Sequence, residues 1–440
     1  MQLQRLAIIA DDLTGASDSG VQFARKGLRT QVVFDWKALD AESAGWDTIV
    51  VDTDSRSVPG EAAYGSVRSA AETLKQQKYD WIYKKLDSTL RGNLGQEIDA
   101  VMDVFGFEAA VVVPAFPRIG RTTVNGIHYL NGVPIHETEI ARDPKTPVPE
   151  SDIAKLLAGQ SKRSAALIEL ETLRCGMEAV AARIQTALEA MESPLIIIDA
   201  EADADMERIG QLVSLYGSRL LWVGSAGLAD YLPVQAQGGS GQLNALQPMP
   251  EAEGQAMLVA GSISRITREQ VAQVNEQPNV AAVELDPIAL LTSPEAQASE
   301  EERCYRALID SLGQGLDLSL YAGSSPSQVQ SAKELGARSG LDSSSVSNRI
   351  ADALGRIAGR IVTEYRLAGL VLTGGDTAKA VCRHLGVHGI ELVAELEAGI
   401  PLGRLLGADR MMAVTKAGAF GNAQSLWRAM TILKGEKDNA

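Results

Sequence analysis

The chain has 440 residues, 45% of them apolar, and exceeds the ~250 to 300 residues at which one hydrophobic core stops growing, so we expect two domains. Its 56 acidic and 41 basic residues give a net charge of −15, which argues against nucleic acid or an anionic membrane as a partner. Three widely spaced cysteines, without a signal-type or membrane-spanning apolar run, argue against a secreted or membrane protein, so we expect the cytoplasm.

The first half of the chain alternates short apolar runs with longer helical patterns, which is the rhythm of βαβ units. Helical patterns such as 15–26, 61–76 and 94–105 are long enough to cross over a parallel sheet. These features predict an N-terminal domain over residues 1–235. Its expected strands are 6–10, 30–34, 47–52, 80–84, 109–113, 164–170, 194–199 and 219–224.

A stretch rich in Gly, Pro, Gln and Ser follows and predicts a linker at 236–254. The strand and helix rhythm then restarts and predicts a C-terminal domain over 255–440. The acidic run at 300–302 is expected to open a helix, because carboxylates favour the first turn. The expected strands of this domain are 255–261, 279–285, 316–321, 368–375, 389–396 and 410–415.

The predicted fold class is therefore α/β. Two domains are expected, each built on a largely parallel sheet flanked by helices, with the active site in the interdomain cleft.

In the N-terminal domain, acidic and basic residues follow the expected strands. Ligands of open parallel sheets bind beyond the carboxyl ends of the strands, so these residues are expected to converge. Arg56 and Lys85 are predicted to hold a carboxylate, while Asp12 and Asp87 accept hydrogen bonds from hydroxyl groups of the same small ligand. The alternative is that these residues are helix caps, turn residues and solvated surface charges.

The C-terminal domain contains neither a Walker A sequence nor GxGxxG. Glycine instead follows three expected strands, at Gly261-Ser262, in the LTGGDT segment at 372–377 and at 416–421. Each place leaves backbone N–H groups uncovered before a helix or loop, where phosphate is favoured. The alternative for each segment alone is a tight strand-to-helix connection.

Eight longer motifs occur in a fixed order along nearly the whole chain: IADDLTGASDSG (9–20), DSRS (54–57), KKLDSTLRGN (84–93), PAFPRIGRTTVNGIHYLNG (114–132), GSAGLA (224–229), GSIS (261–264), LTGGDTA (372–378) and KAGAFG (416–421). In these motifs the sequence resembles the four-carbon acid sugar kinases, whose N-terminal domain binds the sugar acid and whose C-terminal domain binds ATP. The resemblance implies substrate contacts through Asp12, Arg56, Lys85, Leu86, Asp87 and Ser88. It implies ATP contacts through Ser262, Leu372, Thr373, Gly374, Gly375 and Gly418.

The implied reaction is ATP-dependent phosphorylation of the C4 hydroxyl of D-threonate, giving 4-O-phospho-D-threonate and ADP in four-carbon sugar acid catabolism. The KLDSTLRG form of the substrate segment is more similar to D-threonate and D-erythronate kinases than to 3-oxo-tetronate kinases, so D-erythronate and 3-oxo-tetronate are the alternative substrates. Mg²⁺ is expected because phosphoryl transfer needs charge neutralisation, and its ligands are not assigned. Asp12 is favoured as the general base, with Asp376 as the alternative because it follows two glycines.

Two other classes of protein compete with a kinase. A small-acid binding protein without catalysis would also have two α/β lobes, but it would have no need of phosphate-binding turns. A dinucleotide-dependent dehydrogenase would need the absent GxGxxG. The expected partners are small molecules, with no nucleic acid and no membrane, and the sequence leaves a homo-oligomer open.

Overall fold

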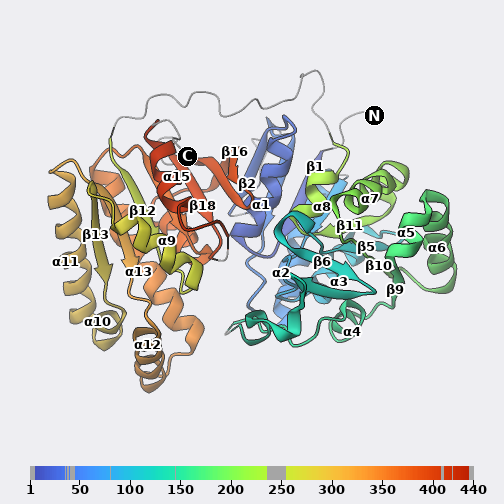
Figure 1. Cartoon of the computed structure of the whole chain (residues 1–440), viewed down its shortest axis with the longest axis horizontal. Coiled ribbons are helices and arrows are strands. Elements are labelled where there is room, and N and C mark those ends of the chain that lie inside the picture. The colour runs from blue at the N-terminus through green and yellow to red at the C-terminus, as the bar shows by residue number, and fades with distance from the viewer. Residues whose placement is uncertain are drawn as a thin grey trace. The chain divides into compact units, whose positions relative to one another are not determined.

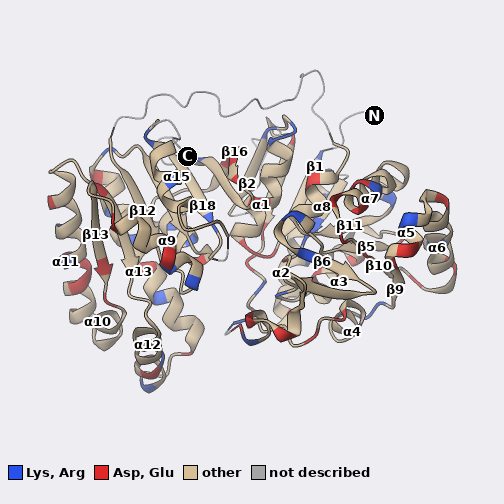
Figure 2. Ribbon diagram, viewed as in Figure 1, with Lys and Arg blue, Asp and Glu red and all other residues tan. Residues whose placement is uncertain are grey.

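The structure is a computed structural model that describes residues 5–34, 36, 39, 45–79, 81–143, 145–234, 254–407, 411–418 and 420–435. The chain divides into an N-terminal unit, Met1–Gln242, and a C-terminal unit, Leu243–Ala440. The predicted linker at 236–254 lies outside the described residues, apart from Gly254. Among the described residues, no helix is both long and apolar enough to cross a membrane. Acidic and basic residues are distributed over the helices of each unit (Figure 2).

A sheet of parallel strands forms the middle layer of the N-terminal unit (Figure 1). Most of its strand residues are fully buried, which explains why the apolar runs are continuous and do not alternate with polar residues. In spatial order the strands are β2 (Thr30–Val33), β3 (Thr48–Asp52), β1 (Leu6–Ala10), β4 (Trp81–Lys85), β11 (Leu221–Gly224), β5 (Ala110–Val113), β10 (Leu195–Ile198) and β9 (Ala165–Ile168).

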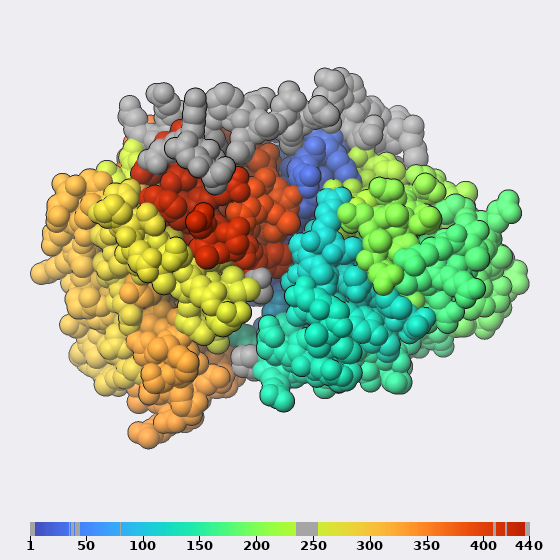
Figure 3. Space-filling view, viewed as in Figure 1, coloured from blue at the N-terminus to red at the C-terminus, as the bar shows by residue number. Residues whose placement is uncertain are grey.

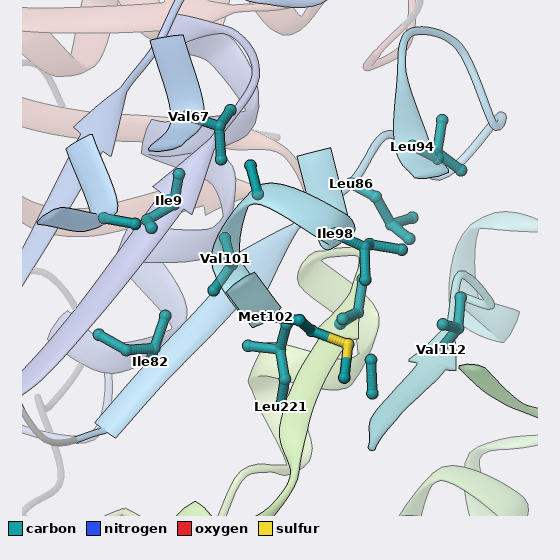
Figure 4. Close-up of a cluster of buried hydrophobic side chains, with 14 of the residues drawn as sticks. Ile9, Val67, Ile82, Leu86, Leu94, Ile98, Val101, Met102, Val112 and Leu221 are labelled. Atoms are coloured by element: carbon teal, nitrogen blue, oxygen red, sulfur yellow. The ribbon is translucent and has the colours of Figure 1, made fainter. Parts of the chain in front are cut away.

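Helices cover both faces of this sheet. On one face, α2 (Gly60–Gln76) and α3 (Leu94–Phe105) bury side chains such as Val67, Ile98 and Met102 against Ile9 and Ile82 of the strands (Figure 4). On the other face, α1 (Leu13–Ala24) packs against α8 (Ala226–Tyr231), and α8 packs against α7 (Asp203–Tyr216). The other α-helices in the described part of this unit are α4 (Ile153–Ala158), α5 (Leu170–Cys175) and α6 (Met177–Ala190).

A small antiparallel sheet, which the sequence analysis did not predict, stands beside the main sheet. It consists of β6 (Arg121–Val124), β7 (Ile127–Leu130) and β8 (Val133–Pro134). Two Asn-Gly turns join these strands, and the asparagines have positive φ values of 53° at Asn125 and 52° at Asn131. Both residues of such a two-residue hairpin turn need positive φ, which Asn-Gly tolerates. The backbone N–H groups of Asn125 and Gly126 donate to Asp199 at 2.6 and 2.9 Å.

The C-terminal unit contains a second, mixed sheet. In spatial order its strands are β13 (Val280–Leu285), β14 (Asp317–Ala322), β12 (Ala256–Ala260), β15 (Gly369–Thr373), β18 (Met412–Lys416), β17 (Ile400–Leu406) and β16 (Gly389–Glu397). The first five are parallel, whereas β17 is antiparallel to both β18 and β16.

Helices also cover both faces of this second sheet. On one face, α9 (Arg265–Asn275) and α15 (Ser425–Leu433) pack together, and their surfaces adjoin in Figure 3. On the other face, α13 (Ser343–Glu364) packs against α14 (Gly375–His384) and α11 (Pro294–Leu312). The helices α10 (Pro287–Thr292) and α12 (Pro326–Arg338) also pack against each other.

Each sheet has a point where the chain leaves neighbouring strands toward opposite faces. In the N-terminal unit, β1 leads to α1 on one face, while its neighbours β3 and β4 lead to α2 and α3 on the other. In the C-terminal unit, β12 leads to α9 and its neighbour β15 leads to α14 on the opposite face. Such topological switch points open crevices at the carboxyl ends of the strands, which is where α/β sheets bind ligands.

The predicted α/β fold class with two largely parallel sheets is confirmed. The prediction for the acidic run is wrong, because residues 300–302 lie inside α11, which begins at Pro294. There the carboxylates have side-chain partners: Glu300 pairs with Arg303 of the same helix, and Glu301 pairs with Arg356 of α13.

Candidate functional site

The carboxyl ends of β1, β3 and β4 bring the predicted substrate residues together. β1 continues into Asp12, which has extended backbone and caps α1 by accepting a hydrogen bond from the Gly15 N–H at 2.8 Å. The turn after β3 carries Arg56, and β4 ends at Lys85 and is followed by Asp87. Because these strands are adjacent and parallel, the three turns lie at one edge of the sheet, which we call the substrate edge.

Arg56 is held by carboxylates of the protein itself. Its Nε and Nη2 donate to Asp11 at 2.7 and 3.0 Å, and its Nη1 and Nη2 donate to Asp12 at 2.8 and 2.7 Å. Burial raises the pKa of Asp11, but the charge and hydrogen bonds of Arg56, together with the charges of Lys84 and Lys85, outweigh burial and leave that pKa lowered. Burial lowers the pKa of Arg56, but its three acidic neighbours, Asp87 included, raise it well above its ordinary value. Arg56 therefore organises the acids of the substrate edge.

Lys85 is the contrasting cation of this edge. The residue is only 3% exposed, yet in the described part of the chain its ammonium group has neither a hydrogen-bond nor an ion-pair partner. A Cβ added to Gly15 would lie 2.8 Å from the Lys85 Nζ, so the ammonium group lies against the first turn of α1. A buried charge is costly unless it is paired, and a helix N-terminus also favours negative charge. This corner is therefore suited to an anionic group of a ligand.

Asp87 is a fixed hydrogen-bond acceptor. Its carboxylate receives the Nε and Nη2 donors of Arg91 at 2.8 and 3.2 Å and the hydroxyl of Thr89. Burial raises the pKa of Asp87, but the charges of Arg91 and Arg56 lower it well below its ordinary value. The side chain is consequently a carboxylate near neutral pH and accepts hydrogen bonds without donating any.

Leu86 and Ser88 contribute to this segment in different ways. The Leu86 side chain packs in the hydrophobic core (Figure 4), and its N–H donates to the Gly224 carbonyl at 2.9 Å. Only the Leu86 carbonyl thus remains for a ligand. The Ser88 carbonyl accepts a hydrogen bond from His128 Nε2 at 2.9 Å, which fixes the backbone beside the Ser88 hydroxyl.

His128 is a site residue that the sequence analysis did not single out. Because a carbonyl only accepts hydrogen bonds, Nε2 must carry the proton, and Nδ1 accepts from the Thr123 hydroxyl at 2.9 Å. Burial lowers the pKa of His128 to about 4, so the ring is neutral. Its presence in the GIHYLNG motif was the available signal, but the contact with a residue 40 positions away is not visible in sequence.

A buried ion pair lies beneath the substrate edge and was also missed. Lys84 Nζ lies 2.8 Å from Glu97 Oε2, and both side chains are almost fully buried. Glu97 also accepts a hydrogen bond from the Ser55 hydroxyl at 2.7 Å. Burial raises the pKa of Glu97, with partial opposition from the Lys84 charge. The pair links β4, α3 and the turn after β3. The sequence feature that could have indicated it is a lysine within an otherwise apolar, strand-like run.

Three glycine-containing turns meet at the carboxyl edge of the C-terminal sheet. A Cβ added to Gly261 would lie 2.2 Å from the Thr377 hydroxyl, and one added to Gly418 would lie 2.5 Å from the Ser262 hydroxyl. Gly374 has φ +98°, a conformation that other residues rarely adopt. The close approach of these backbones explains why glycine occurs in each turn.

The first turn of α14 presents backbone N–H groups at this edge. Its N-cap is Gly374, which has no capping side chain. The Ala378 N–H donates to the Gly374 carbonyl at 3.0 Å, so the N–H groups of Gly375, Asp376 and Thr377 precede the intrahelical ladder. A helix N-terminus of this kind binds phosphate through its N–H groups and its positive dipole end.

Leu372 and Thr373 support this turn as strand residues. Both are fully buried, and the Thr373 carbonyl accepts the Gly261 N–H at 3.3 Å. The Thr373 hydroxyl has no partner among the described residues. These two residues would therefore contact a nucleotide through their backbone atoms. Contact through their side chains would need a local change of structure.

A divalent metal ion was expected without assigned ligands. Within the described ranges, no group of three or more His, Cys, Asp and Glu side chains is arranged to hold one. Mg²⁺ usually takes only one or two protein carboxylates together with ligand phosphates and water. Asp376, in the first turn of α14, fits this limited role beside a bound nucleotide.

Family models match both units. The sugar-binding N-terminal domain matches residues 6–232, and the nucleotide-binding C-terminal domain matches residues 257–426. A D-erythronate kinase of Heliobacterium modesticaldum is 34% identical over 433 residues, covering 96% of this chain and 95% of the relative. A D-threonate kinase of Salmonella typhimurium is 34% identical over 436 residues, covering 98% of each chain.

A solved structure described as a putative tRNA synthase from Salmonella typhimurium LT2 covers 96% of this chain and 98% of its own, with a TM-score of 0.79. Its 24% identity supports a shared fold and no more. The domain models and the full-length relatives, in contrast, match in sequence over nearly the whole chain. The chain therefore belongs to the four-carbon acid sugar kinase family.

Proposed function

We propose that the protein transfers the γ-phosphoryl group of ATP to the C4 hydroxyl of D-threonate, giving 4-O-phospho-D-threonate and ADP. The observation that carries this proposal is the buried Lys85 ammonium group, which lies at a helix N-terminus without a hydrogen-bond or ion-pair partner among the described residues. Asp12 and Asp87 beside it are acceptors for hydroxyl groups. A ligand that satisfies these groups carries one carboxylate and several hydroxyls. D-erythronate is the nearest alternative, followed by 3-oxo-tetronate.

In this proposal Lys85 is the main ligand of the substrate carboxylate, and Arg56 is the second. Four of the five guanidinium N–H groups of Arg56 already donate to Asp11 and Asp12. One N–H group is therefore left for the substrate. Asp12, Asp87 and the Ser88 hydroxyl would contact the hydroxyls, and the Leu86 carbonyl would complete the edge.

ATP would bind at the switch point of the C-terminal sheet. Backbone N–H groups of Gly375, Gly418 and Ser262 would hold the phosphates, supported from behind by the Leu372 to Gly374 segment. Bound Mg²⁺ would neutralise phosphate charge, with Asp376 as the carboxylate of this chain that holds it. This assignment gives each unit one of the two substrates.

In the reaction the C4 oxygen forms a bond to the γ-phosphorus, the bond to the β,γ-bridging oxygen breaks, and a carboxylate takes the hydroxyl proton. Asp12 is our first choice for this base because it belongs to the substrate edge. Its carboxylate is already engaged by N–H groups of Gly15 and Arg56, so Asp376 remains the alternative. The base is the residue whose change to Asn lowers kcat by about 10² to 10⁴ with ligand affinities retained.

The test is ATP-dependent ADP release with D-threonate, D-erythronate, 3-oxo-tetronate and the neutral analogue threitol at matched concentrations, followed by phosphorus NMR of the product. The fastest turnover is expected with D-threonate and very slow turnover with threitol, which leaves Lys85 unpaired in the site. Faster turnover of another acid would change the substrate and keep the kinase. No acid-dependent ADP release with any of them would refute the proposal.

A further inference from the structure

The loop that joins β18 to α15 has its carbonyl groups bound from within the C-terminal unit. The Gly418 carbonyl accepts hydrogen bonds from the hydroxyls of Ser264 and Thr267 at 2.5 and 3.0 Å. The carbonyls of Phe420 and Asn422 accept from the Gln270 side-chain amide at 3.1 and 2.7 Å. Three residues of α9 and its N-cap therefore hold one side of this loop.

Lys416, the last residue of β18, holds the same carbonyls from the loop's own base. Its Nζ donates to the carbonyls of Ala417, Gly418 and Phe420 at 2.8, 3.3 and 3.2 Å. The Thr267 hydroxyl is a fourth neighbour, at 3.4 Å. The loop carbonyls thus surround the ammonium group in the way that backbone carbonyls surround a bound metal cation.

The backbone N–H groups of this loop, unlike its carbonyls, are partly free of hydrogen bonds within the described part of the chain. Among the described residues, the N–H groups of Gly418 and Gly421 have no hydrogen-bond partner. The two amides are not consecutive, because the Phe420 N–H between them donates to the Ala417 carbonyl at 3.3 Å. Uncovered backbone N–H groups in a turn bind anions. Gly418 also lies against Ser262, so its amide belongs to the cluster of turns described above.

Lys416 is unusual for a buried lysine because its hydrogen-bond partners are carbonyls and a hydroxyl, with no carboxylate among them. The residue is 1% exposed, and among the described residues no acidic group forms an ion pair with it. Burial lowers the pKa of Lys416 to about 7, and the charge of Glu397 opposes that shift only in part. Glu397 is itself engaged by the Ser425 hydroxyl at 2.7 Å and by Arg428 at 3.6 Å. The facing side chains of α9, Thr267 and Gln270, are uncharged.

We propose that Lys416 is a positioning residue for the nucleotide, whose ammonium ion gathers the loop carbonyls so that the amides of Gly418 and Gly421 are presented to a phosphate group. This inference rests on the proposed nucleotide site and adds a residue that does not touch the ligand. Its positive charge lies behind the loop and favours the bound anion. Phosphate in turn stabilises the charged form of the lysine, so nucleotide binding and protonation of Lys416 are coupled.

Calorimetry of ADP binding tests the proposal directly. Lys416→Met removes the ammonium ion and keeps most of the side-chain volume, and should weaken ADP binding by about 10- to 100-fold, the loss expected for charge-assisted hydrogen bonds. The affinity for the sugar acid should stay unchanged. Lys26→Met is the matched control, because Lys26 is a partly buried lysine whose Nζ also donates to two carbonyls, those of Ala229 and Leu232 at 2.9 and 2.7 Å, in the N-terminal unit. ADP should bind that variant as it binds the wild type.

Proton uptake by the wild-type protein on ADP binding is a second test, because a lysine with only a structural role would not change its protonation when ADP binds. At about pH 8 the phosphate groups of ADP are fully ionised, so any protons taken up on binding are bound by groups of the protein. If phosphate raises the Lys416 pKa by about one unit, roughly 0.4 proton per ADP is bound, measured by calorimetry in buffers of different ionisation enthalpy. The uptake should vanish in Lys416→Met.

The outcomes separate this inference from the proposed function. Absence of ADP binding to the wild-type protein would overturn the nucleotide site itself. Normal wild-type binding with unchanged affinity in Lys416→Met, or an equal loss in Lys26→Met, would overturn the role of Lys416. If Lys416→Met does not fold, the wild-type uptake decides, and zero uptake overturns the coupling.

Discussion

Replacing Lys85 by Met tests the substrate edge most sharply, because activity and stability should change in opposite directions. The Lys85 ammonium group is buried and has no hydrogen-bond or ion-pair partner among the described residues, and its charge is only a minor cause of the lowered pKa of Asp11, so in the free protein it is a desolvated charge. Pairing it with a substrate carboxylate is worth about 1.5 to 3 kcal/mol as a charge-assisted hydrogen bond. Lys85→Met should therefore lower kcat/KM for D-threonate by roughly 10- to 150-fold.

The free energy of unfolding of Lys85→Met should be unchanged or higher, since an unpaired buried charge is replaced by an apolar group of similar length. The assay is coupled ADP release with D-threonate and with threitol, together with urea unfolding. The preference for the acid over threitol should collapse in the variant, because only the acid loses a partner. Equal losses for both substrates, or wild-type kcat/KM for the acid, would refute the assignment of Lys85.

Three further predictions concern other parts of the two edges. Gly418→Ala should weaken ADP binding at least tenfold in calorimetry, because the added Cβ would lie 2.5 Å from the Ser262 hydroxyl, while KM for the sugar acid stays unchanged. Arg56→Met should lower the free energy of unfolding by about 3 kcal/mol or more in urea titrations at neutral pH, since it leaves the buried Asp11 and the partly buried Asp12 without the guanidinium that binds both; a loss under 1 kcal/mol would contradict this. His128 has a folded-state pKa of about 4 against 6.5 for the free side chain, so the unfolded chain binds the proton first and stability falls as pH drops through this window, by up to ~3 kcal/mol. That component should disappear from the pH dependence of unfolding in His128→Gln, and its persistence would show that another group causes it.

The strands were predictable because both sheets are buried on both faces, which makes their apolar runs continuous. The meeting of Asp12, Arg56, Lys85 and Asp87 was also predictable, since parallel strands end at the same edge of a sheet. Which acidic residue pairs with which basic residue at that edge was not predictable. Arg56 and Lys85 are equivalent cations in sequence, and only the structure distinguishes the guanidinium bonded to Asp11 and Asp12 from the unpaired ammonium.

The antiparallel sheet of β6 to β8 escaped prediction for a different reason. Its strands are short and half-exposed, so they lack a continuous apolar run. The two Asn-Gly pairs were the signal that could have found the hairpins. His128 and Lys416 were missed because burial depends on contacts between distant segments, which residue spacing does not encode.

The Asn-Gly turns have a consequence for the chemical durability of the protein. An asparagine side chain deamidates by cyclising onto the backbone nitrogen of the next residue, and glycine in that place offers the least hindrance. At Asn125 this nitrogen is occupied, because the Gly126 N–H is bonded to Asp199. At Asn131 the corresponding Gly132 N–H has no partner among the described residues, and both residues are exposed. Ageing of purified protein should thus begin at Asn131, on the outer turn of the hairpin, while the turn that orients His128 stays intact for longer.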